Sequence, residues 1–117
     1  MEQAKMDRLA AAGIDAADAL ERFMGSEALL TRFLDRFLED GNMDALRAAV
    51  AAGAWDKALT ASHTLKGMSG NLSMTVLYDL FTRQVALLRQ PDTAGAAALM
   101  PAIEAAYQKA AAAIREM

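Results

Sequence analysis

The sequence contains no cysteine, one histidine and only two prolines among its 117 residues. Without cysteine the chain can form neither a disulfide nor a cysteine-ligated zinc site. Since His63 is the only histidine and the carboxylates form no tight cluster, we expect no metal or cofactor to be bound by this chain. The same scarcity leaves no second histidine for a catalytic triad.

The sequence also lacks long apolar runs and a large excess of charge of one sign. No stretch approaches the ~20 apolar residues of a membrane span, and the N-terminal MEQAKMDRLAAAG lacks the apolar middle of a secretion signal. The formal charge of −3 and the absence of a clustered basic face argue against a nucleic-acid partner. No P-loop or glycine-rich nucleotide motif is present, so the chain has no ATP site of its own. We therefore expect a cytoplasmic protein without nucleic-acid or membrane partners.

What the sequence does contain is helix-forming residues. Apolar residues make up 55% of the chain, which excludes disorder, and alanine, leucine and methionine dominate. Apolar residues recur at helical spacing between breaks at glycine or proline. The helices that this pattern predicts span residues 2–12, 15–23, 26–40, 43–53, 55–72, 75–89 and 95–116. Asp15 and Ser26 are expected as N-caps, and Gly53 as a C-terminal stop.

Short breaks between helices of this length predict antiparallel neighbours. We therefore predict an all-α fold, an antiparallel four-helix bundle with a short N-terminal helical cap. The whole chain, 1–117, would be a single domain, with the cap in residues 1–24 and the bundle in 26–116. Four aromatic residues are expected in its core: Phe23, Phe33, Phe37 and Phe81. Pro101 suggests that the last helix begins a few residues after Gly95, because proline is tolerated only in the first turn.

The helix predicted at 55–72 has two distinct faces. At roughly 100° per residue, its apolar and small residues form one stripe, which should face the core: Ala58, Ser62, Leu65, Ser69 and Leu72. His63, Lys66, Gly67 and Gly70 share the opposite, exposed side. A helix-interior glycine costs roughly 1 kcal/mol relative to alanine, but it lets another molecule approach the backbone. The pattern suits a neutral histidine nucleophile that carries an anion beside a cation, or simply a solvated surface with glycines for helix packing.

These residues resemble a known family. His63-Thr64-Leu65-Lys66-Gly67, followed by Gly70-Asn71-Leu72, is similar to the signature of histidine-containing phosphotransfer (Hpt) domains. The similarity extends upstream through Trp55-Asp56, Leu46-Arg47 and the helix with Phe33 and Phe37, and covers roughly residues 13–90. Two positions depart from the family pattern. Ser73 stands where glycine is frequent, and Arg83-Gln84 stands where an acidic residue is frequent.

The resemblance implies a four-helix bundle and a role for each site residue. His63 would accept a phosphoryl group from a receiver-domain aspartate and pass it to another receiver, using the ring nitrogen farther from the backbone. Lys66 would stabilise the phosphoryl charge, and the receiver would supply an acidic pocket with Mg²⁺. The expected docking face consists of Leu59, Thr60, Gly67, Gly70 and Met74, although Leu59 could equally belong to the core. The partners would be receiver domains of response regulators or hybrid histidine kinases.

The implied protein is a phosphocarrier rather than an enzyme, and we expect it to be a monomer. Two other functions remain open from the sequence. A helical adaptor could keep the Hpt-like fold and bind receiver or kinase domains without carrying phosphate. Alternatively, the chain could self-associate through its alanine-rich last helix.

Overall fold

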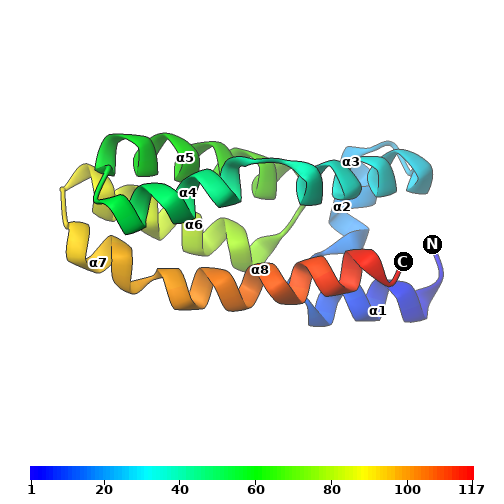
Figure 1. Cartoon of the computed structure of the whole chain (residues 1–117). Coiled ribbons are helices and arrows are strands. Elements are labelled where there is room, and N and C mark those ends of the chain that lie inside the picture. Colours follow the sequence, from blue (N-terminus) through cyan, green and yellow to red (C-terminus); the bar gives the residue numbers. More distant parts are fainter.

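The computed structural model describes all residues, 1–117, and consists of eight helices without a strand (Figure 1). The helices are α1 (Gln3–Ala11), α2 (Ala16–Arg22), α3 (Glu27–Glu39), α4 (Asn42–Ala52), α5 (Trp55–Asn71), α6 (Thr75–Arg89), α7 (Thr93–Ala98) and α8 (Met100–Arg115). None of them combines the length and the apolar character that crossing a bilayer requires. The predicted all-α class is confirmed.

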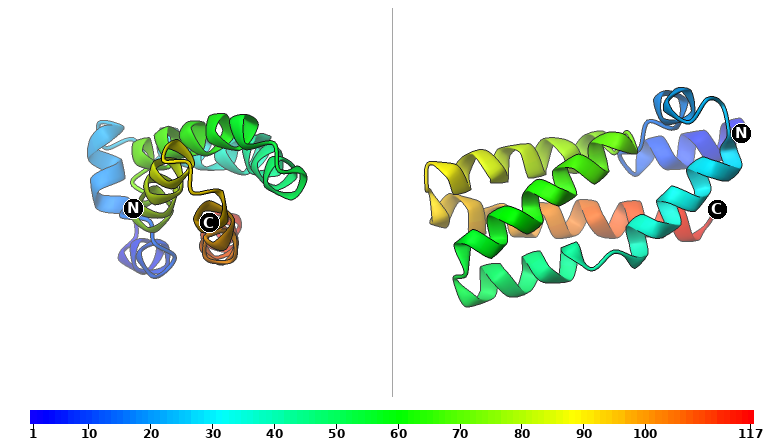
Figure 2. Two further views of the ribbon diagram at one scale, coloured as in Figure 1. Left: turned by 90° about the vertical axis from the view of Figure 1, so that its left-hand side faces the viewer. Right: turned by 90° about the horizontal axis from the view of Figure 1, so that it is seen from above.

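Four antiparallel rods form the bundle. The first rod is α3 continued by α4, and the others are α5, α6, and α7 continued by α8. Between α3 and α4, the Asp40 carboxylate accepts hydrogen bonds from the backbone and side-chain nitrogens of Asn42, both at 2.8 Å. Seen from above, α5 crosses in front of α8, with α4 on one side and α6 on the other (Figure 2). The helix that carries His63 therefore lies between two neighbours.

The core runs the length of the bundle and is aliphatic, with three large aromatic residues, Phe37, Phe81 and Tyr107. Every rod contributes fully buried side chains, including Leu34, Phe37, Leu65, Phe81 and Ile103. Each such side chain contributes about 1.5–3 kcal/mol relative to leaving it in water. Burial of these apolar stripes, rather than helix propensity alone, stabilises the helices.

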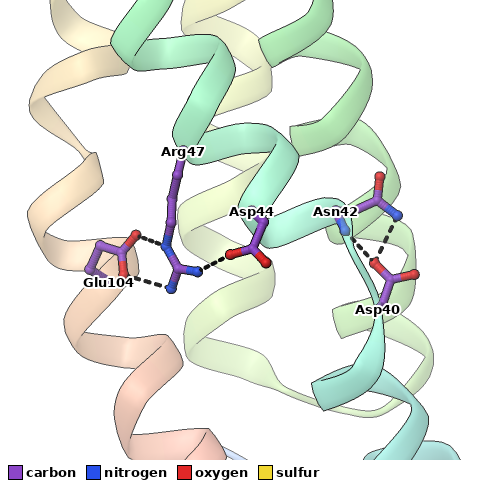
Figure 3. A network of polar contacts seen from close by, with 5 residues as sticks. All are labelled: Asp40, Asn42, Asp44, Arg47 and Glu104. Atoms are coloured by element: carbon purple, nitrogen blue, oxygen red, sulfur yellow. Dashed lines mark hydrogen bonds and ion pairs between the residues drawn. The ribbon is translucent and has the colours of Figure 1, made fainter.

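A polar tether joins the first rod to the last. Arg47 on α4 donates from Nε and Nη2 to the two carboxylate oxygens of Glu104 on α8, at 2.6 and 2.9 Å (Figure 3). Its third nitrogen donates to Asp44 at 2.8 Å, and the guanidinium lies 5.4 Å from the ring centroid of Tyr107. The two-pronged geometry fixes the relative position of α4 and α8 more tightly than a single ion pair would.

The predicted last helix is wrong in one respect, because it is divided. Asp92 accepts a hydrogen bond from the backbone N–H of Gly95 at 2.8 Å and starts the short α7. A new helix, α8, begins at Met100, with Pro101 in its first turn. Proline has no N–H to donate and clashes with the preceding turn, so one continuous helix from residue 95 could not form.

The N-terminal cap lies at the end of the bundle where α3 begins, beside the C-terminal end of α8 (Figures 1 and 2). The predicted caps are confirmed: Asp15 accepts from the Asp18 N–H and Ser26 from the Leu29 N–H. Backbone and side-chain bonds attach the cap to the turn between α5 and α6. The N–H of Asp15 donates to the Ser73 carbonyl at 2.9 Å. Thr75 Oγ1 donates to the Gly13 carbonyl at 3.3 Å.

Two of the four phenylalanines expected in the core lie elsewhere. Phe37 and Phe81 are buried, but Phe33 is 36% exposed and Phe23 is half-buried. Their rings pack against each other with centroids 5.2 Å apart, and the guanidinium of Arg36 lies 5.3 Å from the Phe33 centroid. The reason is geometric: Phe33 lies at the edge of the apolar stripe of α3, where it packs against Phe23 and remains partly exposed.

Candidate functional site

The two faces of α5 are arranged as the periodicity predicts. Its small and apolar stripe is buried, a set that comprises Ala58, Ser62, Leu65, Ser69 and Leu72. His63 and Gly67 are exposed on the other side, and Lys66 and Gly70 are half-buried beside them. The imidazole is therefore accessible in the middle of a helix whose back is fixed in the core.

A buried hydrogen bond fixes the helix directly behind His63. The Ser62 hydroxyl donates to Oε1 of Gln84 at 2.8 Å, and both side chains are fully buried. Gln84 also donates from Nε2 to the Ala96 carbonyl at 3.1 Å and to the Met100 sulfur at 3.2 Å. Gln84 thus joins α5 to α6 and α7, which explains why an uncharged side chain suits this position.

His63 lies in an open groove of about 500 Å³. Three elements line it: the C-terminal half of α5, the first turns of α6, and α2 of the cap. The lining includes His63, Lys66, Gly67, Gly70, Ser73, Tyr78, Asp18 and Arg22. In the end-on view the cap lies on the α6 side of α5, opposite α4 (Figure 2). The groove is therefore a feature of the α6 side.

Lys66 stands one helical turn after His63 on the wall of this groove. It takes part in none of the ion pairs of the structure, so its ammonium is free to turn toward an anion. Its half-buried stem limits the positions that the charge can reach. A cation held beside a nucleophile in this way can stabilise a transferred anionic group.

The two glycines differ in what surrounds them. A Cβ on Gly67 would meet nothing within 4 Å, so this position is open to an approaching molecule. A Cβ on Gly70 would lie 3.0 Å from two ring carbons of Tyr78. The space beside Gly70 is therefore occupied by the Tyr78 ring of the same chain. This corrects the expectation that Gly70 leaves room for a partner.

Of the other residues of the expected docking face, two lie apart from the groove and one is buried at its base. Met74 lines the groove but is only 1% exposed and belongs to the core, because it is the residue at which the chain turns inward to start α6. Leu59 is half-buried and packs against the core. Thr60 is exposed, but it lines a separate groove between α4 and α5, since it lies on the opposite side of His63 from Lys66.

Asp18, Arg22 and Tyr78 are groove residues that sequence reasoning missed. Ser73 Oγ donates to Asp18 Oδ2 at 2.6 Å, and Arg22 Nε donates to the same oxygen at 3.2 Å. These two hydrogen bonds lower the pKa of Asp18 below its ordinary value. Of these three, only Tyr78 could have been identified from the sequence, because it is an aromatic residue outside the apolar stripe of its helix.

Ser73 has a left-handed backbone, with φ of +54°. Glycine adopts this conformation without strain, which explains why glycine would suit this position. Serine accepts the strained conformation here, and its buried hydroxyl binds the cap through Asp18. Ser73 therefore carries a strained backbone, and its side chain provides a hydrogen bond to the cap that glycine could not make.

Comparison with known families matches residues 28–113 to the Hpt domain. This match covers most of the chain and includes the whole of α5. The chain belongs to the Hpt domain family. Neither the comparison with curated proteins nor that with solved structures gave a match. Hpt domains are phosphocarriers of two-component signalling and interact with receiver and kinase partners.

The matched region differs from the resemblance expected at residues 13–90. It begins within α3 and continues into α8, so the fourth rod is part of the Hpt domain, whereas α1 and α2 precede it. Asp18 and Arg22 thus reach the groove from outside the family region.

Nowhere in the chain do three or more histidine or carboxylate side chains gather into a group that could hold a metal ion.

Proposed function

We propose that this Hpt domain is a phosphorelay intermediate, which accepts a phosphoryl group on His63 from the aspartyl phosphate of one receiver domain and passes it to the aspartate of another. The observation that carries the proposal is the exposed imidazole of His63 in the groove, with Lys66 one turn away and open space above Gly67. An adaptor that only binds receivers needs neither the nucleophile nor the cation.

In the first transfer the lone pair of the unprotonated ring nitrogen attacks phosphorus. An N–P bond forms, the P–O bond to the aspartate breaks, and its electron pair leaves with the carboxylate. The proton on the other ring nitrogen is released to solvent, which keeps the phosphorylated ring neutral apart from its phosphoryl oxygens. Nε2, the nitrogen farther from the backbone, is the better-placed nucleophile because it stands clear of the helix.

Each partner has a defined part in this transfer. Lys66 offsets the phosphoryl charge on this chain, and the receiver contributes its acidic pocket and Mg²⁺. The open face at Gly67 lets the receiver bring its aspartate in line with the imidazole. We propose that the domain acts as a monomer in the cytoplasm and that it depends on a kinase–receiver pair for its phosphoryl group.

The test compares the protein with His63→Gln after incubation with a phosphorylated receiver and Mg²⁺. Intact mass is measured before and after brief acid and base treatment, because a phosphohistidine is lost in acid and survives base. We expect the gain of one acid-labile phosphoryl group, absent from the variant. A folded wild-type protein that gains nothing from any receiver of a panel would overturn the proposal and favour the adaptor function.

A further inference from the structure

Arg22 occupies a junction between two depressions of the surface. It lines the groove of His63 and also a second cleft, of about 700 Å³, between α2, α3 and the end of α5. Only Arg22 and Asn71 line both, so they join the two into one continuous surface. We call this the joined surface; its second half is lined by Phe23, Phe33, Arg36, Phe37, Asp40, Met68 and Leu72.

The position of Arg22 is fixed from one side only. Its Nε donates to Asp18, which is itself bound by the buried Ser73 hydroxyl. The other two guanidinium nitrogens of Arg22 make no hydrogen bond within the chain, and the side chain is 52% exposed. The arrangement orients the guanidinium and leaves its forked end free for an external acceptor.

The charge of the joined surface is opposite to that of the whole chain. Its lining has three cations, Arg22, Arg36 and Lys66, against two carboxylates, Asp18 and Asp40, while the chain as a whole carries a formal charge of −3. Asp40 is further occupied by its two hydrogen bonds from Asn42. A local positive surface on an acidic protein attracts an acidic partner to that surface. The negative charge of the rest of the protein repels the same partner from other parts of it.

The joined surface also has an apolar component that is partly exposed to solvent. Phe33 is 36% exposed, and its ring is held against Phe23 and beneath Arg36. Met68 of α5 is half-buried and lines the same cleft. Aromatic, methionine and arginine side chains grouped in this way are typical of the centre of a protein interface.

We propose that Arg22 is a receiver-docking and specificity residue: its free guanidinium binds the acidic rim around the receiver's aspartate, and the Phe23–Phe33 cleft takes an apolar side chain beside that rim. The proposal rests on the phosphotransfer function proposed above. It assigns a function to the N-terminal cap, which precedes the family match and whose α2 supplies Arg22. Asp18 and Ser73 are positioning residues, since they act through Arg22.

The experiment measures the affinity of receiver domains from the same genome, loaded with beryllofluoride and Mg²⁺, for the full chain. Wild type is compared with Arg22→Gln, Arg22→Lys, His63→Gln and the matched control Arg83→Gln. Arg83 is also exposed and paired with an aspartate four residues away, Asp79 at 3.8 Å, but it lines neither half of the joined surface. Circular dichroism and thermal unfolding confirm that each variant is folded.

For the receiver that binds most tightly, we expect Arg22→Gln to weaken affinity about tenfold at low salt and much less at high salt. Arg22→Lys should recover part of the loss, and Arg83→Gln should bind as wild type does. In transfer assays Arg22→Gln should raise KM and leave kcat almost unchanged.

The possible failures separate the two proposals. Equal affinities of wild type and Arg22→Gln, or an equal loss in Arg83→Gln, would overturn the docking role while His63 phosphorylation stands. Binding that depends on Arg22 without any phosphoryl group on His63 would overturn the relay and uphold the docking role. Absence of binding to every receiver would overturn both.

Discussion

The ring of Tyr78 rests against the backbone of Gly70, with two ring carbons 3.0 Å from the place where a Cβ would lie. The contact brings α6 to the rim of the His63 groove and occupies space that a bare glycine suggests is free. Gly67, one turn earlier, has no such neighbour. The two glycines of one helix therefore serve different purposes, and substitution can distinguish them.

Gly67→Ala should stabilise the protein by about 0.5–1 kcal/mol, because alanine restricts the unfolded chain and its Cβ meets open space. Gly70→Ala should gain less, because the ring of Tyr78 must shift, and the gain should return in a Tyr78→Ala background. Urea unfolding of the four variants measures this. Receiver transfer to Gly67→Ala should be several-fold slower despite its higher stability. Equal stabilisation by both alanines would contradict the role given to Tyr78.

Lys66→Gln should slow phosphoryl transfer between a receiver and His63 about tenfold, a moderate effect because a half-exposed cation is screened by water. Stability should change by no more than about 0.5 kcal/mol. Stopped-flow transfer at several salt concentrations provides the measurement. Lys57→Gln is the matched control, since Lys57 is exposed on the same helix but lines the α4 side. An equal slowing in both variants would indicate a general charge effect instead.

Ser62→Ala should destabilise the protein by about 1–3 kcal/mol, because it leaves Oε1 of the buried Gln84 without a donor. Gln84→Met removes the acceptor, so the double variant should lose less than the sum of the single losses. Denaturant unfolding of all four proteins gives this coupling directly. Strict additivity would show that the 2.8 Å hydrogen bond does not contribute to the position of α5.

The cap should loosen in acid. Hydrogen bonds from Ser73 and Arg22 lower the pKa of Asp18 below its ordinary value of 3.8. A carboxyl whose pKa is lower in the folded state contributes stability that is complete above the ordinary value and is lost as pH falls through the folded value. Wild type should therefore be more stable than Asp18→Asn at pH 6, and the difference should vanish near the bottom of the acid range. A difference in unfolding free energy that stays constant with pH would contradict this.

Arg47 and Glu104 should stabilise the bundle without affecting phosphotransfer. A double-mutant cycle with Arg47→Met and Glu104→Gln should give a coupling of about 1 kcal/mol, since the pair is two-pronged but about one-third exposed. Transfer rates should remain those of wild type, because neither residue lines the joined surface. A slower transfer in the single variants would show that the α4–α8 tether reaches the site.

Local sequence determined the helices and the chemistry of α5. Helical periodicity, the caps at Asp15 and Ser26 and the stop at Gly53, with φ of +68°, all act within a few residues. For the same reason the exposed side of His63 could be read from spacing alone. Pro101 fixed the start of α8. The separate short helix before it, α7, depended on the cap at Asp92.

Tertiary structure alone decided what surrounds His63. Asp18 and Ser73 are 55 residues apart, and their contact depends on how the cap packs on the α5–α6 turn. Packing also exposed Phe33, buried Met74 and placed Tyr78 over Gly70. Periodicity reports the direction of a side chain around its own helix, and it holds no information about which distant element covers that side. The exposed position of His63 could therefore be predicted from the sequence, whereas the residues that surround it could not.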